Sequence, residues 1–193
     1  LMFKKAMLVT MLAALPLAIT SCSDDDNPVA SQPKANVMVV HASPNAPAVD
    51  LLVDNNVAGT GLAFPANTGY LPVNAGTRNV KVNVTGTSTT VINADLALTA
   101  NGDYTVFAVD SVSKISTVVL EDNLATPAAG KAHVRFVHLS PNAPAVNITL
   151  TDGTIVFGNK AFKQSTDFTP LDAGTYNLQV RDAATNTAVV LSL

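Results

Sequence analysis

Apolar and polar residues alternate along most of this chain beyond residue 30. Val80, Val82 and Val84 alternate with polar neighbours, and Leu178 and Val180 repeat the pattern near the other end. A two-residue period is typical of half-buried antiparallel strands, because successive side chains point to opposite faces of a sheet. No stretch past residue 30 shows apolar residues repeating every 3.6 positions over the length of a helix. The pattern therefore predicts an all-β protein.

Glycine-containing turns separate the predicted strands. Asn101-Gly102 precedes an apolar run at residues 104–109 and predicts a hairpin. Ala75-Gly76 and Ala173-Gly174 place glycine where a turn needs positive φ before a strand. Many short strands with turns every 8 to 12 residues are typical of a sandwich or barrel. We expect an immunoglobulin-like or transthyretin-like β-sandwich.

The chain contains an internal repeat. The block V-H-A-S-P-N-A-P-A-V-D at residues 40–50 returns as V-H-L-S-P-N-A-P-A-V-N at residues 137–147, with nine identities in eleven positions. A second pair of similar segments, at residues 71–77 and 170–175, follows in nearly the same register. We therefore expect two tandem modules, at residues 36–120 and 132–193, joined by a linker at residues 121–131.

The second copy is shorter than the first. Residues 95–120 are predicted to contain two strands of the first module, and their counterparts would lie beyond residue 193. We expect a C-terminally truncated second module, either from a shortened gene or fragment or because another chain supplies the strands.

The first 21 residues have the organisation of a signal peptide. Two lysines precede an apolar run at residues 6–19, which is followed by small residues and then Cys22. A helix of that run would rise about 21 Å, less than the roughly 30 Å hydrocarbon core of a bilayer. I-T-S-C at residues 19–22 resembles the lipobox of bacterial lipoproteins, which implies cleavage before Cys22 and its acylation.

The segment after Cys22 predicts a tether and a location. Three aspartates at residues 24–26 resemble the export signal that sends some lipoproteins to the outer face of the outer membrane, although a solvated linker has the same composition. Residues 22–35 as a whole predict a flexible spacer. We expect a lipid-anchored protein of the cell envelope, on the outer membrane and facing outward, with the membrane as partner through lipidated Cys22.

The repeated block and the A-G-T turns after it resemble the bacterial extracytoplasmic family called domain of unknown function 4397. The resemblance extends from about residue 36 onward and implies secreted or surface proteins, often with repeated modules and β-sandwich architecture. It brings no catalytic residues. Asn147 in place of Asp50 and Leu139 in place of Ala42 are departures between the two copies.

Two interpretations of the repeated block remain open. Its prolines fix φ and remove backbone donors, so its polar side chains can satisfy the backbone of a stiff loop, and the same loop can form a ligand-binding rim. A hydrolase would instead use His41 and Ser43 with Asp50, but the Gly-x-Ser-x-Gly nucleophile motif is absent from the chain. The candidate residues are His41, Ser43, Pro44, Asn45, Pro47, Asp50, His138, Ser140, Pro141, Asn142 and Pro144.

Composition narrows the function classes. The chain has a net charge of −3 and only 13% charged residues, which disfavours a nucleic-acid partner. Three histidines and one cysteine provide no zinc set, and we expect no metal or other cofactor. Without tryptophan, a glycan-binding platform is less favoured than an unknown protein ligand. The tripeptide beginning at Asp110 resembles a bacterial O-glycosylation motif, which makes Ser111 a candidate acceptor. The leading hypothesis is a non-catalytic surface lipoprotein with binding, adhesion or spacer modules.

Overall fold

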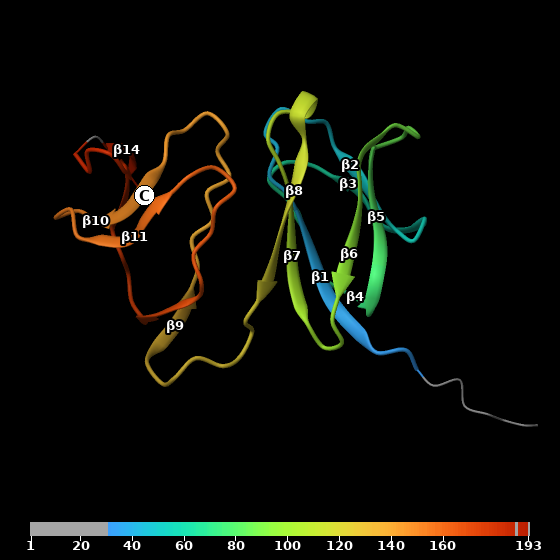
Figure 1. Cartoon of the computed structure of the whole chain (residues 1–193), viewed down its shortest axis with the longest axis horizontal. Helices are drawn as coiled ribbons and strands as arrows, with labels where there is room; N and C mark the ends of the chain where they lie inside the picture. The colour runs from blue at the N-terminus through green and yellow to red at the C-terminus, as the bar shows by residue number, and fades with distance from the viewer. Residues whose placement is uncertain (1–30, 188, 193) are drawn as a thin grey trace, which may run out of the picture. The chain divides into compact units, whose positions relative to one another are not determined.

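The alternating pattern folds into paired strands in the computed structural model, which describes residues 31–187 and 189–192 (Figure 1). The predicted signal peptide, Cys22 and most of the predicted tether lie outside the described residues. The described residues from Gln32 onward form one compact unit. None of the helical structure described there is long and apolar enough to cross a bilayer.

Eight strands build the first module. They are β1 (Lys34–His41), β2 (Val49–Val53), β3 (Asn56–Leu62), β4 (Asn67–Asn74), β5 (Gly76–Val84), β6 (Thr90–Leu98), β7 (Asp103–Val109) and β8 (Ser116–Asp122), with a 3-10 turn, η1 (Val112–Lys114), before the last. One sheet has the order β4-β1-β7-β8 and the other β3-β2-β5-β6. β1 thus begins inside the segment that the sequence assigned to the tether.

The two sheets bury their apolar faces against each other. Alternate residues of β1 are buried, and Val80 and Val82 of β5 are buried as their alternation predicted. The core cluster draws on both sheets and includes Val37, Val39, Leu51, Leu96 and Val106. Burying such side chains contributes roughly 1.5–3 kcal/mol each. The prediction of an all-β sandwich is confirmed.

The predicted hairpin at Asn101-Gly102 is wrong. The turn is present, but it carries the chain from β6 in one sheet to β7 in the other. Asn101 adopts the positive φ, 61°, and its N–H donates to the carbonyl of Lys34. The connection brings β7 beside β1 in parallel, an arrangement that a two-residue hairpin cannot make.

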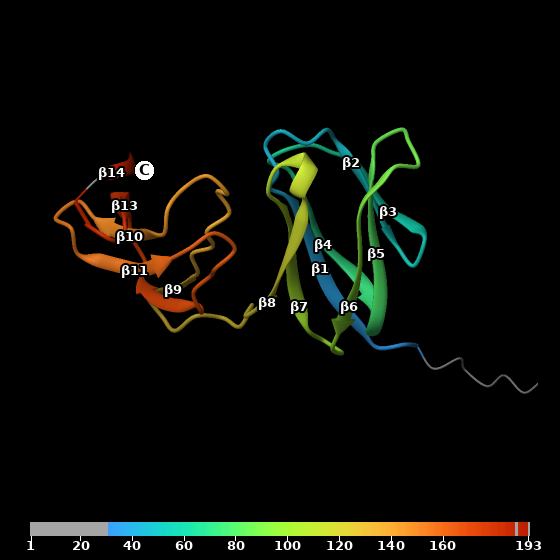
Figure 2. The same cartoon turned by 45° about the horizontal axis from the view of Figure 1, so that its top comes forward.

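Among the described residues, six strands form the second module. They are β9 (Lys131–Val134), β10 (Val146–Leu150), β11 (Ile155–Lys160), β12 (Thr169–Asp172), β13 (Leu178–Asp182) and β14 (Val189–Ser192), coloured yellow-brown to red in Figure 2. The larger sheet has the order β11-β10-β13-β14, and β12 pairs with β9 alone. Of the two predicted glycine turns, Gly76 has a φ of 99° as expected. The prediction for Gly174 is wrong, since it does not adopt positive φ.

Candidate functional site

The histidine of the repeated block fastens the loop that follows it. His41 ends β1 with 0% of its surface exposed, and its Nε2 lies 3.1 Å from the carbonyl oxygen of Pro47. Because a carbonyl only accepts, Nε2 carries the proton and donates it. His138 repeats the contact with the carbonyl of Pro144 at 3.0 Å and is 3% exposed. Each histidine therefore closes its own proline-containing loop.

The serine of the first copy holds the same loop to β7. Ser43 is fully buried, and its hydroxyl donates to the carbonyl of Asp110. One residue earlier, the N–H of Ala42 donates to the carbonyl of Ala108 over 2.8 Å. The hydrogen bonds of His41 and Ser43 thus go to separate backbone carbonyls and not to each other.

Asp50 and Asn147 perform one structural task in the two copies. The Oδ1 of Asp50 accepts the N–H of Gly61 at 2.8 Å, and the Oδ1 of Asn147 accepts the N–H of Asn159 at 2.7 Å. Both donors have positive φ, and the strand register slips beside Asp50 and beside Asn147. An amide oxygen can accept this bond as well as a carboxylate, which explains why the aspartate can become asparagine.

Hydrogen bonds also stabilise the charged form of Asp50. The Gly61 N–H, and after it the hydroxyl of Thr85, lower the pKa of this carboxyl below its usual value. The Ser, His and Asp residues of the hydrolase alternative thus make three separate structural contacts.

The tip of the loop is exposed. Pro44, Asn45 and Pro47 face solvent, as do Asn142 and Pro144 in the second copy, while Pro141 is half-buried. Asn45 also accepts the N–H of Val112 at 3.2 Å. The loop thus presents a stiff rim, which His41 holds through the Pro47 carbonyl and Ser43 holds through the Asp110 carbonyl after β7.

Ser111, the candidate glycosylation site, lies just before η1. It is half-buried, and its N–H donates to the Asp110 carboxylate at 2.7 Å. Its hydroxyl lies 3.4 Å from that of Ser113.

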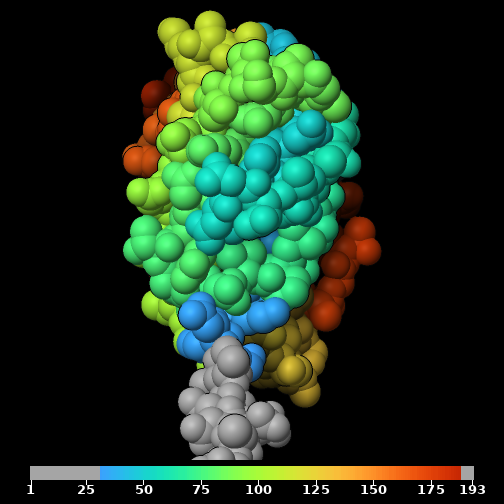
Figure 3. Space-filling model, turned by 90° about the vertical axis from the view of Figure 1, so that its right-hand side faces the viewer, coloured from blue at the N-terminus to red at the C-terminus, as the bar shows by residue number. Residues whose placement is uncertain are grey.

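A hollow of about 360 Å³ opens between β3 and β4, on the side of the first module that Figure 3 faces. Its apolar lining includes Val53, Leu71 and Val73, and its polar lining includes Asn56 and Asn74. β3 and β4 are the outer strands of their sheets, so the two sheets are not joined along this side.

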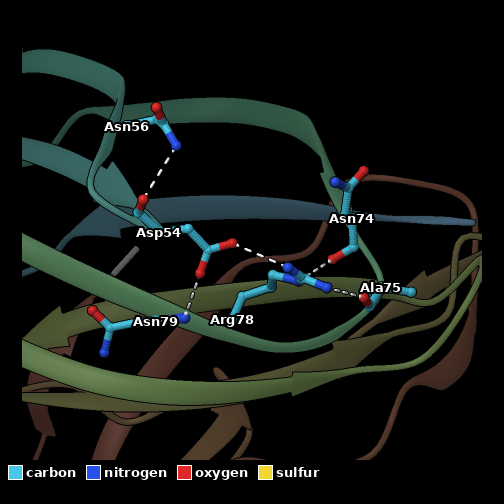
Figure 4. Close-up of polar contacts among 6 residues, drawn as sticks. All are labelled: Asp54, Asn56, Asn74, Ala75, Arg78 and Asn79. Atoms are coloured by element: carbon cyan, nitrogen blue, oxygen red, sulfur yellow. Dashed lines mark hydrogen bonds and ion pairs between the residues drawn. The ribbon is translucent and has the colours of Figure 1, made fainter. Parts of the chain in front are cut away.

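Asp54, which lines this hollow, forms an ion pair with Arg78 (Figure 4). Arg78 Nη1 lies 3.2 Å from the Asp54 carboxylate, and the same guanidinium donates to the carbonyls of Asn74 and Ala75. The N–H of Asn79, and after it Arg78, lower the pKa of Asp54. These groups satisfy one another, and they fix the turn between β4 and β5.

A buried carboxylate at the end of β8 is a further feature that sequence reasoning missed. The side chain of Asp122 is 1% exposed and accepts from the hydroxyls of Tyr70 and Thr105, at 2.8 and 2.6 Å. It also pairs with Arg135, whose guanidinium lies 4.5 Å from the ring centroid of Phe168. Burial, followed by the hydrogen bond to Asp122, raises the pKa of Tyr70. Asp122 lies in phase with buried Val118, which was the signal available in the sequence.

The repeated block and its strands can now be compared with known proteins. The family model for a domain of unknown function (DUF4397) matches residues 35–149. The chain belongs to this family. The match begins one residue into β1, covers the rest of the first module and ends within β10, so both copies of the block lie inside it. A search of the curated proteins finds no match. Membership in DUF4397 confirms the resemblance in the sequence and assigns no activity.

Proposed function

We propose that this DUF4397 protein is a non-catalytic lipoprotein of the cell envelope, anchored through acylated Cys22, with its β-sandwich modules facing outward as binding, adhesion or spacer units. The partner is a protein or, less favoured, a glycan. One observation carries the non-catalytic part. The histidine of both copies, Asp50 with Asn147, and Ser43 of the first copy hold the backbone of their own module, which supports a structural role for the repeated block and not a reaction centre.

The anchor and the outward location rest on the sequence. The order of basic residues, apolar run and Cys22 supports lipidation, and the three aspartates that follow support export to the surface. Two or more acyl chains on one cysteine hold a protein on a membrane stably, whereas a single chain binds only marginally. A flexible segment before β1 would then hold the modules away from the lipid surface.

Metabolic labelling with a fatty-acid analogue tests the anchor, and protease treatment of intact cells tests the location. We expect label on the wild-type chain, none on Cys22→Ala, and digestion of the wild-type chain before the outer membrane is opened. A chain labelled equally in both forms would contradict anchoring at Cys22. Protection from protease until the outer membrane is broken would move the modules to the periplasm.

Activity measurements test the alternative of a hydrolase. Ser43→Ala would abolish a hydrolase activity without lowering the melting temperature if Ser43 were a nucleophile. Because its hydroxyl is buried and donates to the Asp110 carbonyl, we expect the melting temperature to fall instead. A stable Ser43→Ala variant that loses hydrolysis of ester or peptide substrates would overturn the non-catalytic proposal.

A further inference from the structure

The first module has two distinct ends. β1 begins at Lys34 and ends at His41, within the repeated block. At its start, the N–H groups of Ala75 and Asn101 donate to the carbonyls of Pro33 and Lys34, so the turns after β4 and β6 lie there. The loops after β1, β3, β5 and β7 lie at the other end, as Figure 1 shows for η1 and the loop between β5 and β6. We call this surface the far end, and it consists of residues 42–48, 63–66, 85–89 and 110–115.

Hydrogen bonds fasten the four loops of the far end to one another. The N–H of Thr85 donates to the carbonyl of Ala48 at 2.9 Å and joins the loops after β5 and β1. The N–H of His41 donates to the carbonyl of Ala66 at 3.0 Å and joins the loop after β3 to the end of β1. Two side chains of the repeated block hold the loop after β7, as described above. A surface of fixed loops loses little conformational entropy on binding, which favours its use in recognition.

Two large apolar side chains are exposed on the far end. Phe64 is 48% exposed and Val112 is 41% exposed. Their loops adjoin β4 and β7, the two neighbours of β1 in its sheet. The ring of Phe64 lies edge-on to the buried ring of His41, with the two centroids 6.5 Å apart, and this contact orders it at the surface. Ordered apolar side chains on a stiff surface are typical of protein–protein interfaces.

The far end carries no net charge, unlike the chain as a whole. From Cys22 onward the chain has 9 basic and 14 acidic residues, a net charge of −5. The far end contains one acidic residue, Asp110, and one basic residue, Lys114. Two copies that meet through their far ends bring no net charge together, whereas the negative charge of the rest of the chain opposes other contacts between copies.

We propose that the far end of the first module binds the far end of a second copy of the chain. A twofold axis brings the same loops together from both sides, so Phe64 of each copy packs on apolar and proline side chains of the other, the exposed Pro47 among them. The threonines and the serine at residues 85–89 provide uncharged donors and acceptors for a polar rim. A neutral, apolar surface suits a copy of itself, because a charged partner gains no electrostatic complementarity from it.

This contact gives the adhesion role of the proposed function a partner, and in that respect it rests on the anchor at Cys22. The anchor precedes β1 and joins the module at the Lys34 end, so the far end is the part of the module most distant from its attachment. Copies on two facing membranes then meet head to head. Because many contacts act together between two membranes, a contact that is weak for one pair of molecules is sufficient for adhesion.

Clustering of lipid vesicles tests the proposal without relying on lipidation in cells. The chain from Cys22 onward, which keeps the compact unit from Gln32 whole, is coupled through its only cysteine to phosphatidylcholine vesicles that carry a maleimide lipid. We expect light scattering to rise as the coated vesicles cluster. An excess of free chain with a blocked thiol should reverse the rise, and fluorescent vesicles without protein should stay out of the clusters.

Two substitutions and a matched control locate the contact. Phe64→Asp and Val112→Asp each place like charges on both sides of a twofold contact, and each should weaken self-association in analytical ultracentrifugation by about tenfold or more and abolish clustering. Val57→Asp makes the same change at a valine of β3 that is 67% exposed and lies outside the far end, and it should leave both measurements within about twofold of wild type. Melting temperatures show whether each variant is folded.

Several results would overturn the proposal. These are the absence of clustering by the wild-type chain, clustering that persists in both Phe64→Asp and Val112→Asp, or an equal loss in Val57→Asp. Capture of the vesicles without protein would make a lipid surface the occupant instead. Because coupling through Cys22 replaces the acyl anchor, none of these results bears on lipidation or location, which metabolic labelling and protease treatment test separately.

Discussion

Replacing His41 with alanine tests whether the repeated block is a structural clamp. The imidazole is 0% exposed, donates to the Pro47 carbonyl and lies with its ring centroid 6.5 Å from that of Phe64. Alanine would leave that carbonyl without its partner, at a cost of about 1–3 kcal/mol. It would also leave a cavity the size of the imidazole ring. Comparable large-to-small substitutions in protein cores lower the free energy of unfolding by up to about 3–5 kcal/mol. Allowing for partial collapse of the loop, we expect a loss of about 3–5 kcal/mol in the free energy of unfolding.

Urea unfolding followed by circular dichroism measures this loss. Small domains are stable by about 5–15 kcal/mol, so the first module of His41→Ala should unfold at a much lower urea concentration than wild type. Hydrogen exchange should quicken first in the loop between β1 and β2. His133→Ala is the matched control, because His133 is only half-buried in β9, and it should cost less than about 1.5 kcal/mol.

A small effect of His41→Ala would refute the clamp. If the loss were below about 1 kcal/mol, the hydrogen bond and the packing of the ring could not be what keeps histidine at this place. Loss of an enzymatic activity without loss of stability would favour the hydrolase alternative. A matching loss for His138→Ala in the second module would extend the structural explanation to both copies.

Three further substitutions have defined outcomes. Asp50→Asn keeps the acceptor for the Gly61 N–H and should remain folded at pH 7. The pKa of Asp50 is lowered on folding, so protonation of this carboxyl destabilises the wild type but has no counterpart in the variant. In unfolding measurements at different pH values, the wild type should therefore lose more stability than the variant as the pH falls below about 4. Asp122→Ala leaves Arg135, whose side chain is 11% exposed, without its carboxylate and should cost about 3–5 kcal/mol in thermal unfolding, whereas an unchanged melting temperature would contradict a structural role for the pair. Gly102→Ala places a Cβ 2.7 Å from the Thr99 hydroxyl and should cost about 1–3 kcal/mol by urea unfolding, with retained stability showing that the turn can shift freely.

Periodicity was sufficient to predict the class of fold. Apolar and polar residues alternate at residues 79–84, and this alternation alone was enough to predict a strand with one buried face. Gly76, just before this segment, has the positive φ of the predicted turn. Asn101-Gly102 misled because the dipeptide specifies a tight turn but not which strands the turn connects. The parallel partnership of β1 and β7 depends on contacts between segments about 67 residues apart, as in the bond of Asn36 to Asp103, and no local pattern records them.

The candidate site was predicted in its residues but not in its contacts. The repeat directed attention to His41, Ser43 and Asp50. Their partners are backbone groups of Pro47, Asp110 and Gly61. Because nearly every residue carries the same backbone groups, the sequence does not mark which of them is the partner. The charged pairs were missed because their partners are distant along the chain and each charge alone is typical of a solvated surface. Asp122 was missed too, although its sequence carried a signal: an aspartate in phase with buried Val118 favours a buried carboxylate that needs a cation.

Comparison of the two copies distinguishes the contacts that both modules make from those that depend on β7, the strand paired with β1 in the first module. The histidine clamp and the acceptor at position 50 or 147 make the same contacts in both copies, so the fold of either module explains them. The serine differs, because the Ser43 hydroxyl binds the carbonyl that follows β7, whereas Ser140 is exposed. A serine present in both copies but buried in only one shows that its burial depends on β7 and not on the six strands that the two modules share.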